Sequence, residues 1–222
     1  MDFEQLAKIE NESERVNRTY DIFNEDARLN HSKAARVEFL TTVHYIAVHG
    51  RKEMTKIQYE NLTIRQAEVA DAKQLAAWWN DGAVMAHAGF PNGLGTTEEE
   101  VVKGLRNGLL VVEESDRLIG ECNYHNASDG VAEIGIKICE TDCQNRGVGR
   151  KVLSMLIRWL FRNGYAEIIL DTNLTNTRAQ HVYELLGFRK VRTNIDSWKD
   201  QLGRLQSSVD YALVEQDFVS YE

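Results

Sequence analysis

Residues 144–150 read QNRGVGR, with two glycines one residue apart at the junction between two apolar segments. The preceding run, VAEIGIKIC (131–139), is expected to be a strand, and the following stretch, KVLSMLIRWLFRNG (151–164), has the spacing of an amphipathic helix. A helix start carries unpaired backbone N–H groups and a partial positive charge, and glycines let a phosphate approach those groups. The stretch therefore predicts an anion site, to which Arg146 and Arg150 add charge-assisted hydrogen bonds.

Three known phosphate-binding sequence motifs can be compared with this loop. A P-loop needs Gly-x-x-x-x-Gly-Lys followed by Ser or Thr, which is absent, and a dinucleotide fingerprint needs a third glycine where Val152 stands. The remaining pattern is Gln-x-x-Gly-x-Gly, made by Gln144, Gly147 and Gly149. A tight turn with packing glycines and no ligand stays open as the alternative.

A second motif follows about thirty residues later, NTRAQHVYELLGF (176–188). Asn176 is a good helix N-cap and Gly187 a good C-terminal stop. Helical spacing places Tyr183 on the apolar, inward face, where a buried phenol needs a polar partner. The alternative reading is an ordinary core tyrosine.

The chain has 222 residues and divides into two parts. We expect a helical N-terminal extension over 1–53 and a mixed α/β domain over 54–222, with consecutive antiparallel strands before the first crossover. Strands are expected near 62–67, 109–115, 118–126, 131–139, 166–173, 188–195 and 207–216, and helices near 71–81, 97–108, 151–161 and 176–187.

The glycine loop and the tyrosine helix, in this order and each after a strand, resemble the GNAT superfamily of acyl-CoA-dependent N-acetyltransferases. The resemblance covers about 62–222, and LTIRQAEVADAKQLAAWWND (62–81) with SSVDYAL (207–213) looks most like the branch of ribosomal-protein-alanine and diamine acetyltransferases. It implies an α+β fold whose mixed, mostly antiparallel sheet is splayed at its centre and flanked by helices.

The resemblance also implies a site for acetyl-CoA as co-substrate, with no metal. The loop amides would hold the pyrophosphate, the end of the preceding strand would pair with the pantetheine arm, and Asn176 would contact that arm from the other side. The residues given a cofactor-binding role in this way are Ile138, Cys139, Gln144, Asn145, Arg146, Gly147, Val148, Gly149, Arg150 and Asn176.

The expected chemistry is direct attack by a primary amine on the thioester, in a ternary complex. Tyr183 matches the family's general acid, since a phenol is suited to protonate the departing thiolate. Glu133 is the candidate general base, with Glu121 and His125 in reserve; a solvated strand carboxylate is the alternative for Glu133. The acceptor would be a small-molecule amine or a peptide N-terminus.

Acceptor specificity is expected in the first two helices of the domain and in the loops HAGFPNGLG (87–95) and SWKDQLGR (197–204). Trp78 and Trp79 cannot both face the core of one helix, so one of them is a candidate to line the acceptor cleft. A second hypothesis for the whole chain is a non-catalytic acyl-CoA-binding sensor or interaction module.

Composition bears on other classes of function. A net charge of −8 argues against a nucleic-acid partner. The 3 cysteines, Cys122, Cys139 and Cys143, form neither a disulfide framework nor a recognisable zinc pattern. No secretory signal or apolar run long enough for a membrane span is present, so we expect a cytoplasmic protein without a membrane partner.

The extension shows a second resemblance. Residues 13–46 are similar to the leading helices of small SAM-dependent methyltransferases, but no glycine-rich SAM loop follows. The resemblance therefore predicts no methyltransferase activity. A packing arm, a homodimer contact and a helical extension with no binding role are the readings left open.

Overall fold

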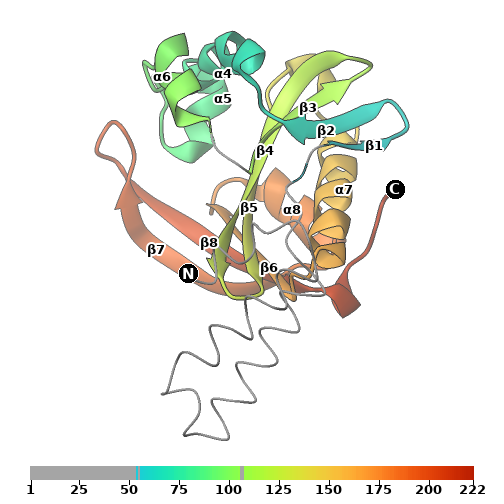
Figure 1. Ribbon diagram of the computed structural model, residues 1–222. Helices are drawn as coiled ribbons and strands as arrows, with labels where there is room; N and C mark the ends of the chain where they lie inside the picture. Colours follow the sequence, from blue (N-terminus) through green and yellow to red (C-terminus); the bar gives the residue numbers. More distant parts are fainter. Residues whose placement is uncertain (1–53, 55, 106–107) are drawn as a thin grey trace, which may run out of the picture. The chain divides into compact units, whose positions relative to one another are not determined.

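The computed structural model describes residues 54, 56–105 and 108–222. Within this part, the strands form one eight-stranded sheet in the order β1-β2-β3-β4-β5-β6-β8-β7 (Figure 1). The strands are β1 (Lys56–Tyr59), β2 (Leu62–Gln66), β3 (Leu109–Glu114), β4 (Arg117–Ser128), β5 (Val131–Ile138), β6 (Glu167–Asn173), β7 (Arg189–Lys199) and β8 (Leu205–Val214). The helices are η1 (Val69–Asp71), α4 (Ala72–Trp79), α5 (Gly82–Met85), η2 (Ala86–Ala88), α6 (Glu98–Gly104), η3 (Thr141–Cys143), α7 (Val148–Arg162), α8 (Thr177–Leu185) and η4 (Glu215–Asp217).

The sheet opens between β5 and β6. These two strands are parallel and pair only at Val131 with Glu167, Ala132 with Ile168 and Glu133 with Ile169. Every other neighbouring pair of strands is antiparallel. Beyond Glu133, β5 continues to Ile138 with no strand pairing on the β6 side in the part of the chain that the structure describes, so the sheet's hydrogen-bond ladder is interrupted at that edge. The predicted central splay of a mostly antiparallel sheet is confirmed.

The sheet carries a core on each face. Leu110 and Val112 belong to the cluster beneath α7, whereas their neighbours Leu109 and Val111 belong to a cluster with α4 and α6. Because side chains alternate along a strand, the two clusters lie on opposite faces. In Figure 1, α4, α5 and α6 are accordingly drawn together, apart from α7 and α8.

The amphipathic pattern of α7 explains why this helix forms and docks. Val152, Leu156 and Leu160 recur at helical spacing and are fully buried in the first of the two cores. Burial of each such side chain stabilises the fold by about 1.5–3 kcal/mol, and a cavity at Leu156 would cost about 2–5 kcal/mol. This helix therefore fixes the position of the glycine loop at its N-terminus.

Most of the predicted elements are present. The expected hairpin around Ser115 and Asp116 is confirmed, with φ values of 52° and 63° at its turn. The structure adds β1, which was not predicted, and extends β7 to Lys199, into the stretch expected to be a loop. The predictions for residues 1–53 lie outside the described residues.

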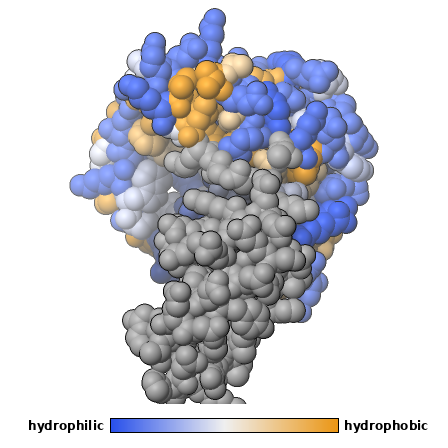
Figure 2. Space-filling view, in the orientation of Figure 1, coloured by the Kyte–Doolittle hydropathy of each residue, from blue (hydrophilic) through white to orange (hydrophobic). Residues whose placement is uncertain are grey.

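Polar side chains cover most of the described part on the face shown in Figure 2. None of the helices in the described ranges is long and apolar enough to cross a membrane.

Candidate active site

The divergence of β5 and β6 creates a cleft of about 1060 Å³. Its walls are the splayed part of β5, the glycine loop with the start of α7, the end of β6, and α8. Side chains of α5, η2 and β7 complete the lining. The predicted site residues that the structure brings together on these walls are Glu133, Ile138, Gln144, Asn145, Gly147, Val148, Gly149, Arg150, Asn176 and Tyr183.

The glycine loop passes through the left-handed region of backbone conformation at two residues. Asn145 and Gly147 adopt φ values of 58° and 80°, in the left-handed region that favours Asn and Gly. The Gln144 side chain donates from Nε2 to the Ile138 carbonyl over 2.8 Å, which ties the loop to the end of β5. A Cβ on Gly149 would lie 3.6 Å from Ile138, so this glycine keeps the helix start clear on the cleft side.

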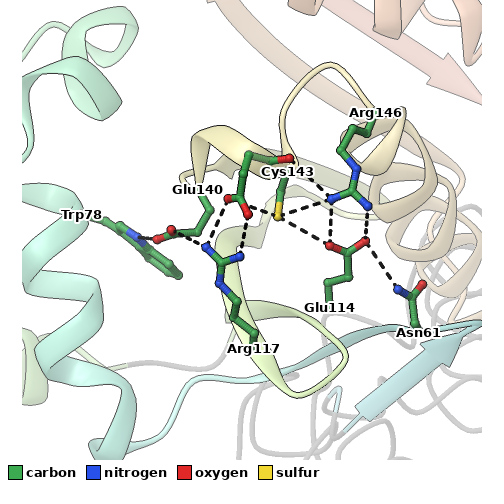
Figure 3. Close-up of polar contacts among 8 residues, drawn as sticks. Asn61, Trp78, Glu114, Arg117, Glu140, Cys143 and Arg146 are labelled. Atoms are coloured by element: carbon green, nitrogen blue, oxygen red, sulfur yellow. Dashed lines mark hydrogen bonds and ion pairs between the residues drawn. The ribbon is translucent and has the colours of Figure 1, made fainter.

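A network of polar side chains that do not line the cleft supports the loop (Figure 3). The Arg117 guanidinium pairs with Glu140 at 2.8 Å and with Asp142 at 2.7 Å. Glu140 in turn accepts a hydrogen bond of 2.9 Å from the Trp78 indole. These contacts connect α4, β4 and η3, and they position the loop without occupying the cleft.

Two of the predicted cofactor residues do not line the cleft. Arg146 pairs with Glu114 at 3.2 Å, away from the cleft (Figure 3). Cys139 is 5% exposed in the α4–α6 core, and its backbone N–H donates to the Ile119 carbonyl at 2.9 Å. Partners distant in sequence therefore engage the Arg146 guanidinium and the Cys139 N–H away from the cleft, whereas the Arg146 backbone N–H remains part of the glycine loop.

Two arginines of the cleft have no carboxylate partner within the part of the chain that the structure describes. Arg150 stacks on the Tyr221 ring at 4.0 Å, and its Nε is buried without a hydrogen bond to the described residues. Arg178, at the start of α8, reaches only the amide oxygens of Gln144 and Asn145, each at 3.3 Å. Two such cations facing a glycine loop suit an anionic ligand. Sequence reasoning missed Arg178, although it lies in the quoted tyrosine-helix motif.

Carboxylates lie at another part of the cleft. Glu133 on β5 is 3.3 Å from His125 Nε2, and Asp171 projects from β6. Partial burial raises the pKa of the Asp171 carboxyl above its ordinary value, and the charges of Glu133 and Asp210 raise it further. Sequence reasoning missed Asp171; the available signal was a carboxylate directly after the apolar run Ile168–Leu170 of β6.

Tyr183 lies between the cleft and the core. Its side chain is 7% exposed and packs edge-on against Phe188 and Tyr211, with ring centroids 5.9 and 5.6 Å away. Burial raises the pKa of the phenol above its ordinary value, with a further contribution from Asp171. The hydroxyl therefore stays protonated at neutral pH, as a proton donor must.

Residues 61–189 match the family model described as the acetyltransferase (GNAT) domain, which is more than half of the chain. The chain belongs to the GNAT acetyltransferase family.

Relatives of this GNAT protein agree on the fold. It is 31% identical over 87 residues to mycothiol acetyltransferase of Saccharopolyspora erythraea, a match covering 39% of this chain. The chain spans 29% of the length of that curated relative. A crystal structure of spermidine N-acetyltransferase from Vibrio cholerae, in complex with CoA and spermine, superposes with a TM-score of 0.63 at 22% identity, covering 71% of this chain and 97% of that one. Ribosomal-protein-alanine N-acetyltransferase from Brucella melitensis gives 0.59 at 21%, covering 68% and 98%.

Glu121, one of the two alternative candidates for the general base, and the two tryptophans of α4 have structural roles in this GNAT domain. Glu121 is 3% exposed and accepts hydrogen bonds from Trp79 Nε1 at 2.9 Å and Lys137 Nζ at 2.7 Å, so its carboxylate is fully engaged. Neither Trp78 nor Trp79 lines the cleft, because each indole donates to a carboxylate beneath α4. The interpretation that one of them faces the acceptor was wrong.

Proposed function

We propose that this chain transfers an acetyl group from acetyl-CoA to a primary amine by direct attack in a ternary complex. The observation that carries the proposal is the composition of one cleft. The glycine loop lines this cleft with two arginines that have no carboxylate partner among the described residues. The cleft is also lined by carboxylates, by Tyr183 and by the part of β5 that does not pair with β6. Each is a part that the reaction needs.

The phosphate-binding role falls to the glycine loop. The N–H groups over 145–150 take the pyrophosphate, and Arg150 and Arg178 neutralise its charge. The pantetheine arm lies along the unpaired edge of β5 towards Ile138. Asn176 stands opposite; its Oδ1 accepts from the Ala179 N–H at 3.2 Å, so its side chain caps α8 as it faces the cleft.

The group that takes the proton of the amine and the group that protonates the thiolate lie on opposite faces of the sheet. Ile134 and Leu170 belong to the core under α7, so the adjacent carboxylates Glu133 and Asp171 point to the opposite face. Tyr183 belongs to the α7 side. The amine therefore approaches from the face of α4–α6, while the thiolate leaves towards Tyr183.

The reaction follows from this placement. The amine nitrogen bonds to the thioester carbon while an N–H of the β5 edge stabilises the developing oxyanion. The C–S bond then breaks, and the sulfur takes the proton of the Tyr183 hydroxyl. The nitrogen loses its proton to Glu133 or to Asp171. The raised pKa of Asp171 favours it as a second candidate for the base.

The test is an assay of CoA release with a panel of polyamines, aminoglycosides, amino acids and short peptides, together with thermal stabilisation by CoA. Turnover with at least one amine is expected. Stabilisation by CoA without turnover on any amine would instead favour the non-catalytic acyl-CoA sensor.

Within the same proposal, residues 54–222 form the catalytic domain, and residues 1–53 are an N-terminal extension to it. The family match over 61–189 lies inside the proposed domain. The two superposed structures differ by one percentage point in identity, so they do not choose between a ribosomal-protein-alanine-like and a diamine-like acceptor.

A further inference from the structure

Arg150, in the first turn of α7, lies against an aromatic ring. Its Cζ is 4.0 Å from the centroid of the Tyr221 ring, close enough for the ring face to attract the cation. A Cβ placed on Gly147 would lie 3.8 Å from Arg150 Nη2, so the end of the guanidinium reaches the glycine loop. The guanidinium therefore lies next to the Tyr221 ring and next to the loop that lines the cleft.

The guanidinium of Arg150 keeps its donors available. Among the residues that the structure describes, none accepts a hydrogen bond from it, and its Nε is buried. Arg146, in the same loop, is held differently, because it pairs with Glu114 at 3.2 Å. A carboxylate in that position would compete with an anionic ligand, whereas a ring does not. Arg150 is thus held by a group that leaves its N–H donors for an anion.

Tyr221 is itself fixed by α7 and α8. Its backbone N–H donates to Ser154 Oγ at 3.0 Å, and its hydroxyl donates to the Leu185 carbonyl at 3.3 Å. Ser154 is fully buried on α7, and Leu185 is the last residue of α8. The backbone and the hydroxyl of Tyr221 are both anchored, so the position of the ring does not depend on Arg150.

The neighbours of Tyr221 follow the same two helices, and Figure 1 shows the end of the chain beside α7. The Val219 N–H donates to the Leu186 carbonyl at 3.0 Å, directly after α8. Glu222 pairs with Arg158 of α7 at 3.3 Å. Residues 219–222, distant in sequence from the glycine loop, therefore form a support for its arginine.

We infer that Tyr221 is a positioning residue for the cofactor, whose ring holds the Arg150 guanidinium at the glycine loop, in place to bind the diphosphate of CoA. The inference rests on the proposed function, whose cofactor site it extends to residues 219–222. A freely rotating arginine loses that freedom when an anion binds, and a stacked arginine has less to lose. Stacking uses the flat face of the guanidinium and leaves the N–H donors at its edge. Tyr221 acts through Arg150, since it does not itself line the cleft.

The test is a double-mutant cycle on the affinity for CoA, measured by calorimetric titration of the full-length protein without an amine. Tyr221→Leu keeps an apolar side chain without a ring face and should weaken CoA binding about three- to tenfold. Tyr221→Phe keeps the ring and should bind CoA within about twofold of wild type. Arg150→Met removes the charge at similar length and should weaken binding at least as much as Tyr221→Leu. Adding Tyr221→Leu to Arg150→Met should cause no further loss, because the ring acts through the arginine.

Tyr59→Leu is the matched control. The Tyr59 ring centroid lies 5.8 Å from Lys151 Nζ, so this variant removes a ring from the cation at the next position of α7. Lys151 pairs with Glu60 and does not line the cleft. The affinity for CoA should therefore stay within about twofold of wild type.

An unchanged affinity in Tyr221→Leu, an equal loss in Tyr221→Phe, or a further loss when Tyr221→Leu is added to Arg150→Met would overturn the inference. The outcomes also separate it from the proposed function. Binding of CoA that does not depend on Tyr221 would refute the inference alone. Binding that does depend on Tyr221, without release of CoA from acetyl-CoA on any amine, would refute the proposed reaction and leave the inference standing. A wild-type protein that does not bind CoA would refute both.

Discussion

Replacement of Tyr183 by phenylalanine removes one hydroxyl and keeps the ring. The edge-on contacts with Phe188 and Tyr211 depend on the ring, so the core under α8 should remain packed. We expect the free energy of unfolding to change by no more than about 1 kcal/mol, the usual net contribution of one hydrogen bond. The change therefore isolates the proton that the mechanism assigns to this hydroxyl.

The expected kinetic effect is much larger than the effect on stability. A positioned general acid contributes about 10²–10⁴-fold to the rate, which corresponds to about 3–5.5 kcal/mol of the barrier. Because the pKa of Tyr183 is raised by burial, the wild-type phenol stays protonated beyond pH 10 and adds no ionisation to the neutral pH range. The loss of kcat should therefore be the same at pH 7 and pH 8.

The assay is the initial rate of CoA release at saturating amine, with the affinity for CoA measured separately. Tyr211→Phe is the matched control, since Tyr211 is 1% exposed in the same aromatic cluster but does not line the cleft. Its kcat should stay within a few-fold of wild type. A Tyr183→Phe enzyme with more than a third of the wild-type kcat would refute the role of this residue as general acid.

Three further predictions concern the cofactor and the base. Gly147→Ala, at φ 80°, should lower the free energy of unfolding by about 1–2 kcal/mol, measured by denaturant unfolding. Gly149→Ala should leave that free energy unchanged and weaken only the binding of CoA. Equal losses of stability in the two variants would contradict this expectation. Asp171→Asn should raise the melting temperature at pH 7 and not at pH 3, because a carboxyl with a raised folded pKa loses stability as pH rises through that pKa; a lowered melting temperature at pH 7 would count against it. Arg178→Ala should weaken CoA binding about tenfold in a salt-dependent manner, and Arg146→Ala, whose guanidinium faces Glu114, should weaken it less; the reverse order in a CoA titration would overturn the assignment.

The parts of the site that follow from local sequence are the glycine loop and the helix of Tyr183, and both line the cleft. The glycine loop requires a left-handed conformation at Gly147, and the helix of Tyr183 has its own cap and stop, so neither depends on distant residues. The splayed sheet was expected from the family resemblance that these two motifs carry, and not from the motifs themselves. A turn or a helix end that is set by neighbouring residues keeps its conformation whatever packs against it.

Other features of the site depend on contacts between residues distant in sequence. Arg146 and Cys139 sit at predicted positions in the chain, but Glu114 and Ile119, which are distant in sequence, decide where their polar groups point. The pKa of Asp171 is raised by its burial and by the charges of Glu133 and Asp210, which lie on other strands. The sequence of β6 alone does not show that these groups are near. Gln201 hydrogen-bonds to the backbone of Gly89, Asn92 and Gly93, which no periodicity of the sequence connects with it. These features arise from tertiary contacts and need the structure.

The most direct test is a crystal structure of the protein with bound CoA. We expect the pyrophosphate on the N–H groups of 145–150, the pantetheine arm along the open edge of β5, and the sulfur within about 4 Å of the Tyr183 hydroxyl, close to hydrogen-bonding reach. CoA bound outside the cleft between β5 and β6, or a sulfur atom on the side of the sheet away from Tyr183, would contradict it.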